Sequence, residues 1–298
     1  MHANRTFAVI GGDLRQVYLA GLLSGEGYNV LAVGFERDVE VSTDVLRVKS
    51  AAEAVMKSNC VILPLPYSVD RDTVNAPFAR SPIPLEEIWG AASEHQLVTG
   101  GMFPESIYAI ALRNKFTLVD YYDREELAIL NSIPTAEGAI GIAMEEMPIT
   151  IHDSKCLVTG FGRVSKMLCR DLAALGGQVT VCVRKYSDLA WIKALGYTPV
   201  HISALDKVIS SFDVVFNTVP AVILSENLLS RLKKDCLCID LASKPGGVDF
   251  ETAGRLGIKT VWALSLPGKV APLTSGCIIK DTILNILTEV SSGKVSVL

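Results

Sequence analysis

Residues 157–168, LVTGFGRVSKML, decide how the second half of this chain is interpreted. The stretch begins with apolar residues typical of a strand and continues with the spacing of an amphipathic helix. Gly160 and Gly162 stand between them, where a dinucleotide loop needs one glycine for a tight turn and another for close approach of the pyrophosphate. Ser165 takes the place of the third glycine, whose role is only helix packing. The stretch therefore predicts a dinucleotide-binding loop, with an ordinary strand–helix turn as the alternative.

The end of the next predicted strand favours NADP over NAD. An NAD site usually has Asp or Glu about 20 residues after the loop, bonded to the ribose 2′-hydroxyl. This sequence has Arg184 and Lys185 there, which attract a 2′-phosphate, and Ser187 can donate a further hydrogen bond. The alternative is that both cations are simply solvated. This alternative is stronger for Lys185 than for Arg184, because of the position of Arg184. The predicted contacts of this half of the cofactor are Gly160, Phe161, Gly162, Arg163, Val164, Arg184, Lys185 and Ser187.

Two later strand ends belong to the same predicted site. The stretches FNTVP (216–220) and IDLASKPGG (239–247) both follow strand patterns, and ligands bind at the carboxyl ends of parallel strands. We expect Asn217, Thr218 and Pro220 to line the path from the adenosine to the nicotinamide. Ser243 is expected near the nicotinamide, and Asp240 either lies there or serves only to cap a helix or hold a loop.

Strand and helix patterns alternate through most of the chain, which predicts an α/β protein with two Rossmann-like parallel-sheet domains and a ligand cleft between them. We expect a substrate- and partner-binding domain over residues 1–135, a connecting helix and linker over 136–152, and an NADP-binding domain over 153–276. Residues 277–298 form a predicted helix that returns to the first domain. Its apolar stripe needs a partner and comprises Ile278, Ile279, Ile283, Ile286 and Leu287.

A second glycine turn, GGDLRQ (11–16), follows the first predicted strand. It lacks the second spaced glycine, and Asp13 and Arg15 would crowd a pyrophosphate. Arg15 and Gln16 at a helix start suit a small carboxylate instead. We therefore predict a substrate site here rather than a dinucleotide site. The alternative has Asp13 as a helix cap and Arg15 solvated.

Other candidates come from loops expected to face the same cleft. Tyr67 and Ser68 follow a strand of the first domain, in LPLPYSVD (63–70). The pair Gly268–Lys269 precedes the last helix and is predicted to form a flexible segment with one cation, an anion anchor or proton carrier. A surface lysine is the alternative there.

The junction region resembles a long helix interrupted at Pro134. Thr135 is the expected cap of its second part. Glu137 follows within the first turn, where its carboxylate either acts as a base or merely stabilises the helix terminus.

Composition excludes several classes of function. The net charge is −4 without a basic block, so a nucleic-acid or anionic-membrane surface is not expected. The longest apolar runs are too short for a membrane span, and the N-terminus enters a strand directly, so we expect a cytoplasmic protein. The seven cysteines fall mostly in apolar runs typical of buried thiols. Cys236 and Cys238 should face the same side of a strand, and no metal site is predicted.

Four stretches together resemble the A subunit family of bacterial dipicolinate synthase: AVIGGDLRQ (8–16), PTAEGAIGIAME (134–145), the segment 158–185 that contains the dinucleotide loop, and LPGKVAPLTSG (266–276). The resemblance covers essentially the whole chain. It implies NADP-dependent formation of dipicolinate from a lysine-pathway precursor, dihydrodipicolinate or its hydroxylated tetrahydro form. It also implies a hetero-oligomer with a smaller, flavoprotein-like B subunit in the mother-cell cytoplasm of a sporulating bacterium.

The implied chemistry needs anchors for two carboxylates, groups that orient the ring, and a base. The resemblance does not assign these roles to residues. We expect carboxylate anchoring by Arg15 and Lys269, with Gln16 beside them, ring orientation by Tyr67 and Ser68, and Glu137 or Asp13 as the base.

Three other interpretations compete with this one. A 2-hydroxy-acid dehydrogenase normally needs a late catalytic histidine, and none follows His201. A shikimate-type NADP dehydrogenase fits the NTVP stretch and the basic strand end, but it needs a Lys–Asp pair that the first domain does not clearly offer. A module that senses NADPH or binds a partner without chemistry of its own is the third.

Overall fold

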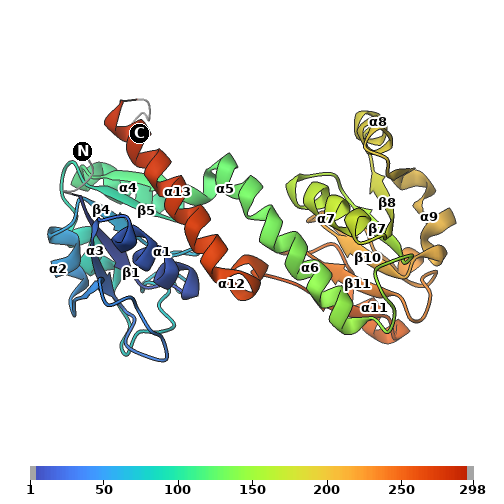
Figure 1. Cartoon of the computed structure of the whole chain (residues 1–298), viewed down its shortest axis with the longest axis horizontal. Helices are drawn as coiled ribbons and strands as arrows, with labels where there is room; N and C mark the ends of the chain where they lie inside the picture. Colours follow the sequence, from blue (N-terminus) through green and yellow to red (C-terminus); the bar gives the residue numbers. More distant parts are fainter. Residues whose placement is uncertain (1–4, 294–298) are drawn as a thin grey trace. The chain divides into compact units, whose positions relative to one another are not determined.

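The computed structural model describes residues 5–293, which form two compact α/β units. Unit 1 runs to Leu130 and resumes at Ala271, and unit 2 is Asn131–Val270. Each unit contains a six-stranded parallel sheet (Figure 1). The prediction of two Rossmann-like parallel-sheet domains is confirmed, whereas a cleft between them stays a prediction.

Unit 1 places its strands in the order β3-β2-β1-β4-β5-β6, the doubly wound order of dinucleotide-binding folds. Alternate residues of each strand face opposite sides of the sheet, so Phe7 and Val9 join one core and Ala8 and Ile10 the other. The strands are β1 (Thr6–Ile10), β2 (Asn29–Val33), β3 (Leu46–Arg47), β4 (Cys60–Ile62), β5 (Leu97–Gly100) and β6 (Thr117–Asp120).

Helices cover both faces of this sheet. One face carries α1 (Leu14–Gly25), α5 (Glu125–Leu130) and α13 (Pro272–Ser291). The other carries α2 (Ala51–Met56), α3 (Leu85–Ala91) and α4 (Glu105–Asn114).

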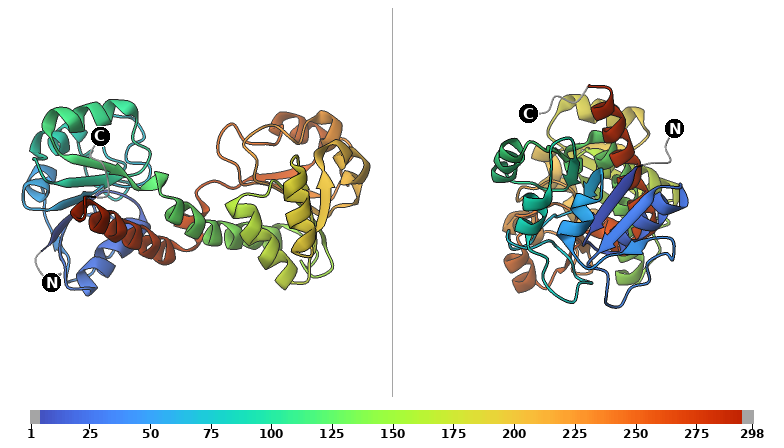
Figure 2. Two further views of the ribbon diagram at one scale, coloured as in Figure 1. Left: turned by 90° about the horizontal axis from the view of Figure 1, so that it is seen from above. Right: turned by 90° about the vertical axis from the view of Figure 1, so that its left-hand side faces the viewer.

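The last helix returns to unit 1, as predicted, and lies beside α1 (Figures 1 and 2). The five residues of its expected apolar stripe are all buried in the same core as Phe7 and Leu19. Gly276 allows close packing, because a Cβ there would lie 2.6 Å from the carbonyl oxygen of Arg15. The helix begins at Pro272, five residues before the expected position, because proline fits the first turn of a helix. It ends at Ser291, and the last part of the expected helix, residues 294–298, lies outside the described residues.

Unit 2 repeats the same order, with β12-β11-β10-β7-β8-β9. Its strands are β7 (Lys155–Thr159), β8 (Gln178–Val183), β9 (Thr198–His201), β10 (Val214–Asn217), β11 (Leu237–Asp240) and β12 (Lys259–Trp262). One face packs on α6 (Ser132–Glu146), α7 (Arg163–Ala174), α8 (Tyr186–Ala194) and α12 (Leu266–Val270). The other packs on α9 (Leu205–Val208), α10 (Glu226–Leu229) and α11 (Phe250–Leu256).

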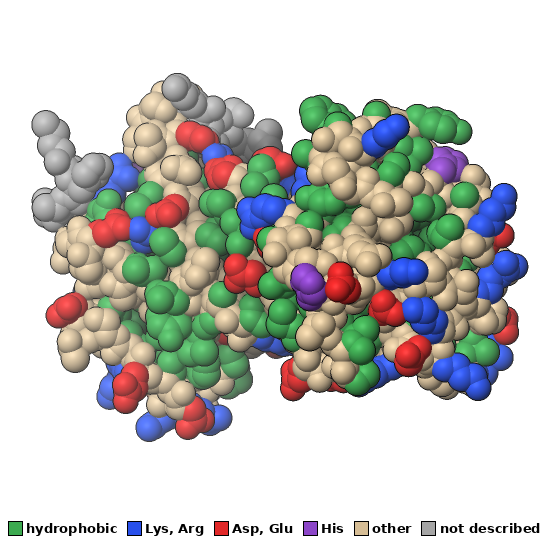
Figure 3. All heavy atoms as spheres, turned by 45° about the vertical axis from the view of Figure 1, so that its right-hand side comes forward, with side chains coloured by type: hydrophobic (Ala, Val, Ile, Leu, Met, Phe, Trp, Pro, Cys, Tyr) green, Lys and Arg blue, Asp and Glu red, His purple; other side chains and the backbone are tan. Residues whose placement is uncertain are grey.

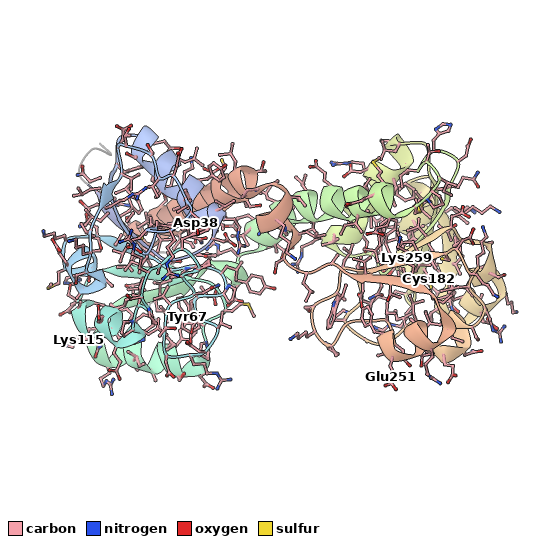
Figure 4. All side chains as sticks on the ribbon, turned by 90° about the horizontal axis from the view of Figure 1, so that it is seen from below. Asp38, Tyr67, Lys115, Cys182, Glu251 and Lys259 are labelled. Carbon is pink, nitrogen blue, oxygen red and sulfur yellow. The ribbon has the colours of Figure 1, made fainter. Side chains whose placement is uncertain are left out.

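The cysteines of unit 2 are all buried and free of disulfides, most of them in or beside strands and Cys169 in α7. Cys236 and Cys238 lie in one core cluster, which confirms that they face the same side of β11. Cys182 lies inside the unit (Figure 4), and burial raises the pKa of its thiol to about 12. These thiols act as small apolar side chains.

The expected cap at Thr135 is wrong. Helix α6 begins at Ser132, and the Thr135 hydroxyl donates to the carbonyl of Asn131 at 2.7 Å. Pro134 does not break the helix, because it lies in the first turn, where its missing N–H would have no intrahelical partner. The break falls at Asn131, between α5 and α6.

The helical stretch Glu125–Glu146 is long and apolar enough to cross a membrane by length and composition alone. Its α6 part buries Ala136, Ala139 and Ala143 against the sheet core of unit 2. The α6 part of this stretch is therefore a core helix of unit 2. Figure 3 shows acidic and basic side chains interspersed on the visible face of the chain.

Candidate functional site

The glycine loop after β7 has the backbone that a dinucleotide loop requires. Gly160 adopts φ +88°, a conformation that favours glycine. A Cβ at this position would lie 2.7 Å from Thr218 Oγ1 and 2.9 Å from Val219 Cγ2. Gly162 caps α7 without a side chain and has open space around it. The loop therefore presents bare backbone and a helix N-terminus, which together attract phosphate.

Ser165 does what the third glycine does elsewhere. It is fully buried on α7 and lies 2.7 Å from the hydroxyl of Thr218 at the end of β10. Thr218 in turn donates to the carbonyl oxygen of Thr159 at 2.7 Å. Two hydroxyls thus hold the helix start, the β7 end and the β10 end together.

The other predicted loop residues lie at the surface of the same sheet edge. Phe161 and Val164 are half-buried and Arg163 is exposed. The ammonium group of Lys166, which sequence reasoning missed, lies 5.5 Å from the centre of the Phe161 ring. Lys166 adds a second cation to the first turn of α7.

Arg184, Lys185 and Ser187 are exposed directly after β8, where they were predicted. The carbonyl of Arg184 lies 3.1 Å from Nε2 of His201, which ends β9. Tyr186 stacks on the His201 ring with 5.3 Å between centroids. The backbone of this basic turn is therefore held by His201, and within residues 5–293 the side chains of Arg184 and Lys185 make no hydrogen bond or ion pair. In the sequence, the feature that could have indicated this contact is Tyr186, the aromatic residue after Lys185.

Asn217 was expected to line the path of the cofactor, but its side chain is buried at the carboxyl edge of the sheet. Its side chain is fully buried and bonds Thr159 Oγ1 at 2.6 Å, Asp240 Oδ1 at 2.7 Å and the Val219 carbonyl at 2.9 Å. It therefore positions its neighbours through these bonds. Pro220, in contrast, is exposed at the surface.

Asp240 is also fully buried and holds the loop over residues 242–248, one of the alternatives expected for it. Its carboxylate accepts hydrogen bonds from the backbone N–H groups of Ala242, Gly247 and Val248 at 3.1, 2.7 and 3.3 Å. Ser243 is exposed on this loop. The conformation of the loop is thus fixed by the buried carboxylate of Asp240.

In unit 1 the glycine turn after β1 is covered by another part of the same chain. Gly11 and Gly12 have φ +67° and +101°. The Gly12 N–H donates to the carbonyl of Asn75 at 2.8 Å, and a Cβ on Gly11 would lie 2.7 Å from Val74. The segment 73–80 therefore occupies the place above the glycines where a pyrophosphate would approach.

The same segment also closes the end of β2. The N–H of Glu36 donates to the Phe78 carbonyl at 3.0 Å, and the Glu36 carboxylate accepts from the Arg80 N–H at 3.2 Å. A carboxylate at this strand end binds ribose in NAD sites, but here it binds the chain itself. The chain itself thus covers this turn, and the absence of a dinucleotide from it stays a prediction.

Asp13 caps α1, and Arg15 is not solvated. The Asp13 carboxylate accepts from the Arg15 N–H at 3.0 Å and from the guanidinium at 2.9 Å. The guanidinium also donates to the Leu65 carbonyl at 2.7 Å, and the Arg15 side chain is only 11% exposed. The alternative of a solvated Arg15 is therefore wrong, and Asp13 as a free base would first have to leave this ion pair.

Gln16 is buried and bonds the Tyr121 hydroxyl at 3.4 Å, which itself donates to the Leu63 carbonyl at 3.0 Å. Burial raises the pKa of Tyr121 above its usual range. The phenol thus stays a neutral donor that links α1 to the β4 end.

Tyr67 is almost fully buried in unit 1, 5.0 Å from the Phe103 ring (Figure 4). Burial raises its pKa, with Arg71 opposing the shift. Ser68 is partly exposed, and its hydroxyl bonds Asp70 and the Arg71 N–H at 3.2 and 2.8 Å, so it shapes the loop.

Glu137 and Lys269 are exposed on helices of unit 2, α6 and α12. The predicted flexible segment at Gly268–Lys269 is wrong, because residues 266–270 form α12. Leu266 and Val270 pack within 3.4 Å of the position that a Cβ on Gly138 would take, which fixes α12 against α6. The structure does not bring Glu137 or Lys269 into contact with the glycine loop. Within residues 5–293, no three His, Cys, Asp or Glu side chains are placed to hold a metal ion.

Two doubly wound units, one with an open glycine loop, define a dehydrogenase-like fold. L-alanine dehydrogenase has the same fold, with a TM-score of 0.66 at 13% identity over 96% of this chain and 90% of that one. This likeness concerns the fold alone.

Closer comparisons identify the family. The family model for the N-terminal domain of the dipicolinate synthase A subunit matches residues 6–122. The A subunit of dipicolinate synthase from Bacillus subtilis (strain 168) is 33% identical over 286 residues, 96% of each chain. The crystal structure of the same protein from Bacillus halodurans has a TM-score of 0.88 at 34% identity and covers 97% of this chain and 99% of that one. The chain belongs to the family of dipicolinate synthase A subunits.

Proposed function

We propose that unit 2 binds NADP and that the chain oxidises dihydrodipicolinate to dipicolinate, starting either from dihydrodipicolinate itself or from its hydroxylated tetrahydro precursor, which first loses water. The observation that carries the proposal is the pairing of an open glycine loop after β7 with Arg184 and Lys185 exposed after β8. Bare backbone at the start of α7 suits the pyrophosphate, and cations in place of an acid suit the 2′-phosphate. The family name supplies the product.

The residues of the chain have distinct tasks in this proposal. NADP, when bound, supplies a two-electron acceptor. Gly160, Gly162, Arg163 and Lys166 would hold its pyrophosphate, and Ser165 and Thr218 keep the loop in shape. The ring substrate must have its carboxylates anchored and one proton accepted. Arg15 remains our candidate anchor in unit 1, since Nη1 of its guanidinium is not used by Asp13 or Leu65.

We further propose that the chain works with a smaller flavoprotein-like B subunit in the cytoplasm of the mother cell. The word "subunit" in the names of the relatives supports a partner. The neutral-to-acidic composition and the soluble fold support the compartment.

The proposal is tested by mixing the purified chain with NADP and dihydrodipicolinate, with and without the flavoprotein-like partner, and recording absorbance of NADPH and of the pyridine ring. Equal amounts of both products are expected. NADP binding without turnover in any mixture would favour a sensing or partner-binding module.

Arg184→Asp should weaken NADP binding by about tenfold to a hundredfold and leave NAD binding within about twofold, because a charge-assisted hydrogen bond to the 2′-phosphate is replaced by repulsion. Fluorescence titration with NADPH and NADH measures both affinities. Lys193→Asp, which makes the same charge change at an exposed position near the other end of α8, is the control. Equal losses for the two cofactors would remove the 2′-phosphate assignment.

One dinucleotide should bind per chain, although both units have the doubly wound order. The segment 73–80 covers Gly11 and Gly12 and bonds Glu36, so the unit 1 turn is occupied by the chain itself. Isothermal titration calorimetry with NADP gives the stoichiometry directly. A value of two sites per chain would show that the segment moves aside.

A further inference from the structure

Cations line the carboxyl edge of the unit 2 sheet in the order of its strands. Arg163 and Lys166 lie in the first turn of α7, after β7, and Arg184 and Lys185 follow the neighbouring β8. On the other side of β7 come β10 and then β11, which is followed by the exposed Lys244. Strands lie ~4.8 Å apart, so the end of β11 is about 10 Å from that of β7. In the proposed NADP site, the β7 end takes the pyrophosphate and the β8 end takes the 2′-phosphate, so Lys244 remains for another anion.

The loop that carries Lys244 is rigidly built. Asp240 accepts three backbone N–H groups from it, and Nε1 of Trp262 donates to the carbonyl of Ala242 at 3.0 Å. The N–H groups of Ile223 and Leu224, after β10, both donate to the carbonyl of Gly247 at 3.0 Å. The loop is therefore bonded to β11, β12 and the segment after β10.

Holding the loop in this way requires a buried carboxylate, which an ordinary turn does not require. Asp240 is fully buried, and its hydrogen bonds are donated by backbone N–H groups and Asn217, with no cationic side chain bonded to it within residues 5–293. Burying a carboxylate without a counter-ion is unfavourable. Lys244, at the tip, makes no hydrogen bond or ion pair in the same described range. The backbone that carries this cation is thus held in a defined place, and the cation itself is unpaired within the described residues.

We infer that Lys244 binds a carboxylate of the substrate on the nicotinamide side of the NADP site. The inference rests on the proposed function. In doubly wound sheets the dinucleotide crosses the carboxyl edge with its pyrophosphate at the glycine loop. The adenosine phosphate belongs at β8, so the nicotinamide half extends toward β10 and β11. An anion bound by Lys244 would then be part of the substrate that reacts with the nicotinamide. Ser243 is the neighbouring residue on the same loop.

The test uses the full chain saturated with NADP and dipicolinate as the titrant, followed by calorimetry. Lys244→Gln should raise the dissociation constant of dipicolinate by about tenfold or more, because a charge-assisted hydrogen bond is lost. Lys244→Arg should recover most of the affinity. NADP affinity, titrated separately, should stay within about twofold. The matched control is Lys234→Gln, an exposed lysine just before the amino end of β11.

Unchanged dipicolinate affinity in Lys244→Gln, with the wild-type chain binding both ligands, would overturn this inference alone. A loss of NADP affinity as large as the loss for dipicolinate would also overturn it, because the anion would then be a cofactor phosphate. A wild-type chain that fails to bind NADP would overturn the proposed function as well. Equal thermal melting of the variants shows that folding is not the cause.

Discussion

Replacing Gly160 with alanine should weaken NADP binding on the order of a hundredfold. The residue has φ +88°, where a side chain is strained, and the new Cβ would lie 2.7 Å from Thr218 Oγ1. Thr218 cannot simply move away, because it bonds Ser165 and the Thr159 carbonyl at 2.7 Å each. The glycine loop must shift instead, and its N–H groups then no longer point toward the pyrophosphate. Titration with NADPH measures the loss.

Gly141→Ala is the matched control for this change. Gly141 lies in α6 of the same unit, and a Cβ there meets nothing within 4 Å. Alanine also has a higher helix propensity than glycine, so stability should be kept or slightly raised. If Gly160→Ala binds NADPH as well as Gly141→Ala does, the loop after β7 is not the dinucleotide site.

The features that could be predicted from the sequence are local in the chain. The glycine spacing of residues 160–165 and the following helix pattern lie within one short stretch, and the structure has the strand, turn and helix there. The apolar stripe of α13 follows helical periodicity, so the sequence also predicted that this stripe is buried against another element. In both cases neighbouring residues carry the whole signal.

The features that could not be predicted depend on contacts between distant segments. Nothing in GGDLRQ indicates that residues 73–80 bond to Gly12 and Glu36, because that contact is fixed only when β1, β2 and β4 have assembled. The burial of Arg15 in its ion pair with Asp13 is equally hidden, because the Leu65 carbonyl that completes it comes from another part of the chain.

The Asn217–Asp240 pair shows an intermediate case. Both residues end strands, which the patterns indicated, and the register pairs them directly across β10 and β11. Their polarity suggested a ligand site, whereas the structure uses them to bind each other and the loop after β11. Sequence indicates the sheet edge on which such residues lie, but not whether their side chains face a ligand or the neighbouring strand.

Asp240→Ala should lower the free energy of unfolding of unit 2 by about 3–5 kcal/mol, among the largest effects expected for a single change. The substitution removes the acceptor of the N–H groups of Ala242, Gly247 and Val248 and of one N–H of the Asn217 amide, whose other N–H keeps the Val219 carbonyl. Each buried donor left unpaired costs about 1–3 kcal/mol, and partial access of water to the loop reduces the sum.

Urea denaturation followed by tryptophan fluorescence measures this loss, since Trp262 bonds the same loop through the Ala242 carbonyl. Asp235→Ala removes an exposed carboxylate before the amino end of β11 and should leave the unfolding midpoint unchanged. Equal midpoints for the two variants would show that the loop keeps its shape without Asp240. In that event Lys244 would owe its position to something other than the buried carboxylate, and the loop after β11 would be an ordinary turn rather than a support built for one cation.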